Sequence, residues 1–296
     1  MPSAYPECLL RWTEANFTSD RRRGEICGHG KLLRGRAWRG GPTETPSNRC
    51  ARSADNYAHQ FARNHMLRLV DVSCSGATTA DVLGPSQGLP AQIDALTPDT
   101  ALVTVTIGGN DVGFIADLLA GTCMGNGDPA SRSSAAARIC DAMTARWAAS
   151  AAQAPSAAGA RSGDAWEKVE AGLYRIAQEV RRRSPQARLI FVDYVTVAPP
   201  DHGCQQFPLE GIAATQTRTT AARLAEITAA VAKRSGADIV RASALSRDHH
   251  VCAAEPWVTG FIPVEGAWQF SPYHPNIGAM TAIASALDEH MGHKSR

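Results

Sequence analysis

Several sequence features that mark particular protein classes are missing from this chain of 296 residues. No run of about 18 apolar residues occurs, which excludes a predicted transmembrane helix, and the first residues lack the short apolar block of a signal peptide. The 30 Lys and Arg nearly balance the 28 Asp and Glu, so no strong overall attraction to nucleic acid or anionic membranes is expected. No Cys-x-x-Cys pair occurs, which argues against a zinc knuckle.

The composition that is present predicts one large folded domain. Hydrophobic residues make up 44% of the chain and charged residues 20%, which excludes a disordered protein. The charge is uneven, because residues 1–40 carry eight Lys or Arg and four Asp or Glu. The total is +2, so the remaining 256 residues net −2. We therefore expect an atypical basic segment at residues 1–40 and a domain at residues 41–296.

Eight cysteines, an even number, are many for a cytosolic enzyme. Cys8 and Cys27 lie in the basic segment, and six follow it: Cys50, Cys74, Cys123, Cys140, Cys204 and Cys252. Pairing these six in order would close three successive loops, and the alternative is a set of buried free thiols. Disulfides would indicate a secreted or periplasmic protein, although the chain as written shows no export signal.

From residue 50 onward, β-prone and helical segments alternate. Near-continuous apolar runs, typical of parallel strands covered on both faces, occupy residues 66–72, 101–107, 188–195 and 238–242. Helical spacing of apolar residues predicts helices at 164–183, 214–235 and 277–287, with Gly236 as a C-cap. Residues 125–163, rich in Ala, Ser and Gly, indicate an insertion with one or two weak helices. The pattern predicts a single α/β domain with helices on both faces of a sheet.

Two loops follow predicted strands at the edge of the sheet where chemistry collects. Residues 73–77 contain Gly76, and residues 108–111 contain Asn110. A glycine backbone N–H and an asparagine amide aimed at one point would form an oxyanion hole for acyl transfer. Taken singly, each residue is also a common turn former, and Asp111 is expected to hold its loop by hydrogen bonds.

A third segment, residues 271–276, precedes the last predicted helix and contains His274. A histidine fixed beside prolines titrates where a general base is useful. Alone it would indicate little, but with Gly76 and Asn110 it completes most of a hydrolase site.

These motifs resemble those of the SGNH hydrolases, the GDSL-type lipases and esterases. The matching blocks are SCSGATT, TVTIGGNDVGF and YHPN. A further pattern, Cys-x-Arg-Ser-x-x-x-Tyr, is formed by Cys50, Arg52, Ser53 and Tyr57. It resembles a secreted bacterial branch of the family that has three disulfides. The resemblance spans roughly residues 41–290. It implies a flavodoxin-like three-layer α/β/α fold, Gly76 and Asn110 as oxyanion donors, and His274 as base. It also implies the disulfides Cys50–Cys74, Cys123–Cys140 and Cys204–Cys252, a lipid or other ester substrate met at a transient lipid interface, and no metal or organic cofactor.

The chain departs from the family near its histidine. Many members have Asp three residues before the His, where this chain has Ser271. A serine carries no charge to orient the imidazole, so the main-chain carbonyl of Ser271 is expected to accept the ring N–H instead.

A larger departure is the absence of block I, the Gly-Asp-Ser-like motif that holds the nucleophile after the first strand. Neither Ser3 nor Ser19 occupies a comparable turn. The chain as written is therefore expected to be inactive as a serine hydrolase, with its first strand lost or replaced. Reading the codons of residues 26–40 one base forward permits Val-Ala-Met-Gly-Ser-Ser-Phe-Ala-Ala-Gly-Pro-Gly-Val-Gly, which suggests a frameshift in this segment. The alternative is a genuine basic arm that contacts an anionic partner.

Three further patterns are weaker candidates for a functional site. Residues 84–88 match Gly-x-Ser-x-Gly but follow a predicted short helix instead of a strand, so we expect a loop. His249 and His250 lack ligands at metal spacing. Trp257, Phe261 and Trp268 would line an acyl pocket or simply pack in the core. The sequence thus predicts a carboxylic ester hydrolase, with a non-catalytic ligand-binding protein as the alternative.

Overall fold

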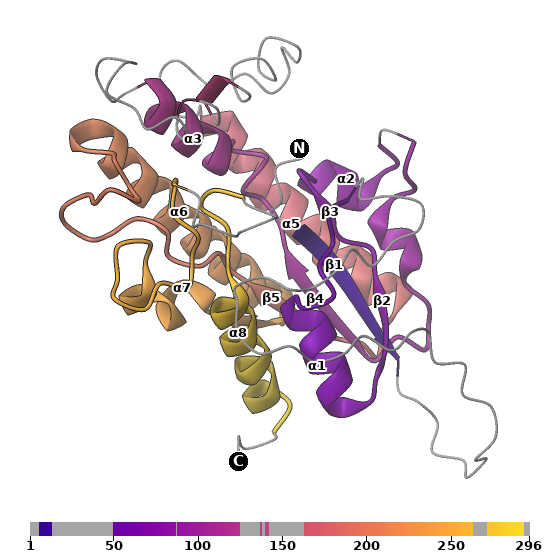
Figure 1. The fold of residues 1–296 in the computed structure, drawn as a ribbon. Coiled ribbons are helices and arrows are strands. Elements are labelled where there is room, and N and C mark those ends of the chain that lie inside the picture. Colours follow the sequence, from indigo (N-terminus) through magenta and orange to yellow (C-terminus); the bar gives the residue numbers. More distant parts are fainter. Residues whose placement is uncertain are drawn as a thin grey trace.

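The structure is a computed structural model that describes residues 6–13, 50–86, 88–124, 137, 140–141, 163–262 and 271–292. Its centre is a sheet in the order β2-β1-β4-β5-β6, with β3 paired to β1 (Figure 1). The strands are β1 (Pro6–Thr13), β2 (Arg68–Asp71), β3 (Cys74–Ser75), β4 (Leu102–Thr106), β5 (Arg188–Val192) and β6 (Asp238–Val240). This is the flavodoxin-like strand order.

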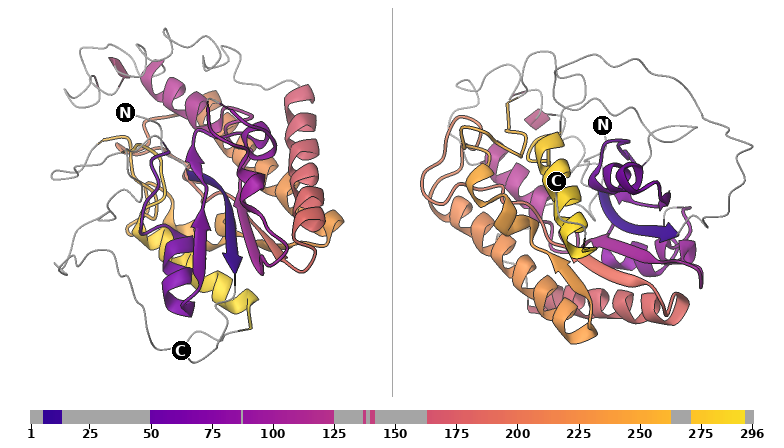
Figure 2. Two further views of the ribbon diagram at one scale, coloured as in Figure 1. Left: turned by 90° about the vertical axis from the view of Figure 1, so that its right-hand side faces the viewer. Right: turned by 90° about the horizontal axis from the view of Figure 1, so that it is seen from below.

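Helices cover the sheet on both sides and complete three layers (Figure 2). On one side α1 (Tyr57–His65) packs against α8 (Ile277–His290), and α7 (Ala242–Leu245) contacts α8. On the other side α5 (Gly163–Arg183) contacts α2 (Thr79–Leu83) and α6 (Gly211–Ser235), which in turn contacts α3 (Phe114–Met124). None of the described helices is both long enough and apolar enough to span a membrane.

The predicted strands after residue 50 are confirmed, in slightly shorter form. β4, β5 and β6 are parallel neighbours, and all five residues of β4 are buried, as expected for a strand covered on both faces. In the part of the chain that the structure describes, the 3-10 helices η1 (Gln92–Ala95) and η4 (Arg247–His249) lie in the connections.

The predicted long helices are confirmed as α5, α6 and α8. Helix α5 buries its apolar stripe, which includes Val169, Leu173 and Ile176, against the sheet layer. Helix α6 ends at Gly236, whose φ of 66° is the left-handed C-cap that glycine favours. Most of the predicted insertion at 125–163 lies outside the described residues.

All three predicted disulfides are formed. They join Cys50 to Cys74, Cys123 to Cys140 and Cys204 to Cys252. Each closes a loop within the domain and so restricts the unfolded chain.

Strand β1 lies in the basic segment and occupies the place of the first strand, which the sequence predicts to be lost or replaced. Pro6–Thr13 fills the position between β2 and β4 but runs antiparallel to both. A gap between two strands exposes unpaired N–H and C=O groups on both sides, and any extended segment can satisfy them. The first strand is therefore replaced, and β1 runs opposite to β5, the other neighbour of β4.

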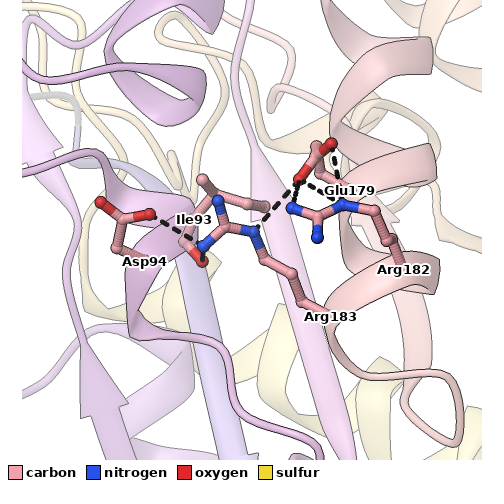
Figure 3. A network of polar contacts seen from close by, with 5 residues as sticks. All are labelled: Ile93, Asp94, Glu179, Arg182 and Arg183. Atoms are coloured by element: carbon pink, nitrogen blue, oxygen red, sulfur yellow. Dashed lines mark hydrogen bonds and ion pairs between the residues drawn. The ribbon is translucent and has the colours of Figure 1, made fainter.

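A polar network ties η1 to the end of α5 (Figure 3). The Arg183 guanidinium donates to the carboxylates of Asp94 and Glu179, at 2.8 and 3.1 Å, and to the Ile93 carbonyl at 3.2 Å. Arg182 shares Glu179, with 2.6 Å between Nη2 and Oε2.

We expect Arg183→Ala to lower the free energy of unfolding by about 1 kcal/mol. The side chains of Arg183 and Asp94 are 27% and 54% exposed, so solvent weakens each ion pair, and the bond to Ile93 adds the rest. Urea denaturation would measure the change. Among the described residues the polar partner of Arg182 is Glu179 alone, so Arg182→Ala is the milder control, and an equal loss in both variants would contradict this account.

Candidate active site

The loop after β3 is shaped by a glycine and a disulfide. Gly76 has a φ of +82°, a conformation that side-chain-bearing residues rarely adopt, and a Cβ added there would meet nothing within 4 Å. The Cys50–Cys74 disulfide anchors the loop. Two backbone bonds add to it, from Ser75 N to Cys50 O at 3.0 Å and from Ala77 N to Cys74 O at 3.1 Å. The backbone around Gly76 is therefore held before any ligand arrives.

The buried carboxylate of Asp71 holds the start of this loop through hydrogen bonds. Asp71 accepts from the backbone N–H and the hydroxyl of Ser73 at 3.0 and 2.6 Å, and from Asn56 Nδ2 at 2.9 Å. Burial alone would raise the pKa of Asp71, but hydrogen bonds from His59, Ser73 and Asn56 outweigh it and lower the pKa. Arg52 of the Cys-x-Arg-Ser pattern donates to the Ser73 carbonyl at 2.6 Å. Asp71 was not predicted from the sequence, although a carboxylate at the end of a predicted strand is a usable signal.

The loop after β4 lies against the Gly76 loop. Asn110 Nδ2 donates to the carbonyl of Ala77, which follows Gly76, at 3.0 Å. The backbone N–H of Gly109 donates to the Tyr194 hydroxyl at 2.8 Å. The structure thus places the two loops that carry the predicted oxyanion donors side by side.

Asp111 fastens the same two loops together. Its carboxylate accepts from the backbone N–H of Thr79, at 3.0 and 3.2 Å, and from the Thr79 hydroxyl at 2.5 Å. Burial raises the pKa of Asp111, against the lowering effect of these bonds. This contact agrees with the expectation that Asp111 holds its loop.

His274 is buried, with 3% of its surface exposed, and its ring is fixed by the main chain. Nδ1 lies 2.6 Å from the carbonyl oxygen of Pro272. This corrects the expectation that the Ser271 carbonyl orients the ring. Burial lowers the pKa of His274 to about 4, opposed by the bond to Pro272. The imidazole is therefore neutral at pH 7, and its pKa lies below the near-neutral range that the sequence predicts for this histidine.

The backbone between Pro272 and His274 explains why the carbonyl of Pro272, and not that of Ser271, binds the His274 ring. Tyr273 has a φ of 62°, a left-handed turn that brings the preceding carbonyl back toward the next side chain. The Ser271 carbonyl instead accepts from the Thr259 hydroxyl at 2.5 Å, and that hydroxyl also accepts from His274 N at 2.9 Å. Tyr273 is fully buried, and its hydroxyl lies 2.9 Å from that of Thr122.

A small cavity of about 30 Å³ lies at the carboxyl ends of β4 and β5, next to the first turns of α8. Pro275, next to His274, lines it together with Tyr194, Tyr57 and Thr106, the last residue of β4. Tyr194 also binds the loop after β4 through Gly109. Tyr194 therefore links the cavity to the loop after β4, and Pro275 places one end of the histidine loop at the same carboxyl edge of the parallel strands.

The reversed strand β1 lies between the loop that carries Gly76 and the carboxyl end of β4. Its register pairs Pro6 with Ser75 and Leu10 with Thr104. Within the described residues, the hydroxyl oxygens of Ser75 and Thr104 are buried without a hydrogen-bond partner. Each such orphan costs about 1–3 kcal/mol. The amino end of β1, not its carboxyl end, lies at the site.

The weaker candidates take structural places. Residues 84–88 follow helix α2 and turn through a bridge between Ser86 and Leu89, which confirms a loop, with residue 87 outside the described residues. His249 stacks on Trp257 at 3.9 Å, and its Nδ1 lies 2.8 Å from the Glu255 carbonyl.

The aromatic residues of the predicted acyl pocket do not come together as one described group. Phe261 is 3% exposed and stacks with Tyr273 at 6.2 Å, which places it in the core behind the histidine loop. Trp257 packs next to Gly278 at the start of α8. Trp268 lies outside the described residues.

Known proteins are similar to this chain in sequence and in fold. Residues 38–278 match the GDSL-like Lipase/Acylhydrolase family. Lipase 2 of Streptomyces coelicolor is 30% identical over 253 residues, which cover 79% of this chain and 75% of the relative. Phospholipase A1 from Streptomyces albidoflavus NA297 superposes with a TM-score of 0.59 at 21% identity, covering 84% of this chain and 92% of that one. The extracellular lipase of Streptomyces rimosus does so with a TM-score of 0.58 at 22% identity and the same coverage. The chain belongs to the GDSL-like lipase/acylhydrolase family.

Proposed function

We propose that the site is the acyl-transfer machinery of a carboxylic ester hydrolase, with Gly76 N–H and Asn110 Nδ2 as oxyanion donors and His274 as general base. The observation that carries this proposal is the bond from Asn110 to Ala77, which holds the asparagine amide next to the Gly76 backbone. Donors fixed before substrate binds stabilise a developing oxyanion without reorganising.

The tautomer of His274 supports its role as base. A carbonyl oxygen only accepts hydrogen bonds, so the contact with Pro272 requires the proton on Nδ1. In the neutral ring, Nε2 then carries the lone pair. It would take the proton of an attacking serine and later pass it to the leaving alcohol. Pro272 is a positioning residue in this scheme.

We further infer that the chain as it stands lacks the nucleophile, because the strand that should deliver it is replaced. The family match begins at residue 38, after most of the basic segment. The carboxyl end of β1 points away from the site. The buried hydroxyls of Ser75 and Thr104, beside β1, have no hydrogen-bond partner among the described residues, as expected if another strand belongs in this position. A one-base slip near residues 26–40 accounts for all three features, with the nucleophile codon straddling Leu32 and Leu33.

The intact parent enzyme would act on a lipid or short acyl ester outside the cytoplasm and meet its substrate at a transient lipid interface. Three disulfides support an oxidising compartment. A similar structure is named an extracellular lipase, and the curated relatives are named lipases. No cofactor is needed for this chemistry.

A second candidate function follows from the same observations. A site that keeps its oxyanion loops and its histidine but lacks a serine would bind acyl or glycan ligands without turnover. The basic segment would then be a genuine arm of the protein.

Resequencing codons 20–45 and labelling with a fluorophosphonate separate these candidates. We expect the chain as it stands to remain unlabelled and the DNA to show a single-base slip that restores Gly-x-Ser after a strand. A confirmed sequence with no label, together with ligand binding, would favour the non-catalytic protein. Labelling of the present chain at one serine would contradict the missing nucleophile.

A further inference from the structure

A groove lies far from the active site, where α5 and α6 end side by side. Both helices run antiparallel to the parallel strands, so their last turns lie at the opposite edge of the sheet from Gly76, Asn110 and His274. The groove has a volume of about 370 Å³, within the roughly 300–1,000 Å³ range of small-ligand sites. Its lining is Tyr174, Ala177, Gln178, Arg181, Arg182, Arg234 and Ser235.

The lining is basic, with three arginines and no acidic residue. Two of these arginines already have carboxylate partners outside the lining. Arg182 binds Glu179, with 2.6 Å between Nη2 and Oε2 (Figure 3), and Arg234 binds Glu170 at 2.8 Å. Among the described residues, no hydrogen bond or ion pair holds Arg181. Its guanidinium is the donor group left for a ligand.

The arginines converge from two helices. Residues 174, 178 and 181 share one face of α5, because helix positions three, four and seven apart align. The side chain of Arg181 reaches toward the end of α6. Its Nη2 atom lies 4.0 Å from the position that a Cβ atom on Gly236, the residue after α6, would occupy. Arg234 comes from the last turn of α6, and its guanidinium stacks over the Tyr174 ring at 4.5 Å. Tyr174 and Glu170 thus hold Arg234 in place before binding.

Favourable interaction with helix dipoles explains only part of this arrangement. Basic residues in a last turn complement the negative end of the helix, which accounts for the presence of Arg181, Arg182 and Arg183 on α5 and of Lys233 and Arg234 on α6. It does not require that two guanidinium groups from different helices face one groove. Planar guanidinium forks match the geometry of phosphate oxygens.

We propose that the groove between the ends of α5 and α6 binds a phosphate group through Arg181 and Arg234. The phosphate would come from a soluble phosphate compound or from an anionic lipid headgroup. This site is independent of the ester hydrolase site, so it does not depend on whether the chain has a nucleophile.

Titration of the full chain with inorganic phosphate, followed by ³¹P NMR or calorimetry, tests the proposal. We expect Arg181→Gln to weaken phosphate binding at least tenfold and Arg181→Lys to weaken it less. Arg175→Gln removes the same charge from an exposed position of α5 outside the groove and should change the affinity less than twofold. Thermal melting of each variant checks that the fold is retained.

A second arm identifies the source of the phosphate. Phosphatidylcholine vesicles with and without phosphatidylglycerol are sedimented with the protein and with both glutamine variants. Retention on the anionic vesicles that depends on Arg181 would assign the site to a lipid headgroup, and phosphate binding without it to a soluble compound. Absence of phosphate binding, or an equal loss in Arg181→Gln and Arg175→Gln, would overturn the proposal.

Discussion

Replacing residues 27–40 with Val-Ala-Met-Gly-Ser-Ser-Phe-Ala-Ala-Gly-Pro-Gly-Val-Gly is expected to raise the kcat for a short-chain p-nitrophenyl ester by about 10⁵-fold over the present chain. Loss of a serine nucleophile or its histidine removes a factor of about 10⁶ from a serine hydrolase, and the oxyanion donors alone retain only a small part. In the variant, the new segment takes the place of β1 as a parallel strand and brings the second serine of Gly-Ser-Ser to the carboxyl edge. Initial rates of ester hydrolysis measure the gain.

The control for this experiment is His274→Ala in the frame-restored background. It keeps the new serine but removes the base, so the rate should return to that of the present chain. Single labelling of the second serine by a fluorophosphonate would identify the nucleophile. High activity of the present chain, or activity of the restored variant that survives His274→Ala, would contradict the proposed mechanism.

The second large effect is a pH dependence of stability carried by His274. Burial lowers the pKa of this histidine to about 4, whereas an unfolded histidine has a pKa of about 6.5. Between these values the unfolded state binds a proton that the folded state does not. The contribution of His274 is therefore complete above pH 6.5 and decreases as the pH falls to 4. The total loss is about 3 kcal/mol in the free energy of unfolding.

Urea denaturation of the present chain and of His274→Gln, at several pH values from 4 to 7, measures this effect. We expect the stability difference between the two proteins to change by about 3 kcal/mol across the range, which separates His274 from buried carboxylates that also titrate. His202 is exposed, so His202→Gln should give a profile parallel to the unchanged protein. Parallel profiles for both variants would show that His274 titrates normally. This test requires no catalytic activity.

The sequence alone predicted the local elements well, because their signals are carried by neighbouring residues. The buried strand at Leu102–Thr106 and the helix at Gly163–Arg183 follow from the periodicity of apolar residues, and Gly236 marks a helix end through its own backbone freedom. The disulfide pairing came from the family resemblance, since cysteine spacing leaves connectivity open, and the structure confirms it.

Only the tertiary structure decided the features that depend on contacts between distant segments. The direction of β1 is set by which extended segment fills the gap beside β4, and no local pattern encodes it. The choice of Pro272 over Ser271 as the partner of His274 depends on the left-handed Tyr273 and on Thr259, which occupies the Ser271 carbonyl. Hydrogen bonds are short and directional, so the conformation of one residue decides which carbonyl reaches the histidine ring. The periodicity of helices and strands, in contrast, is already present in the order of the residues.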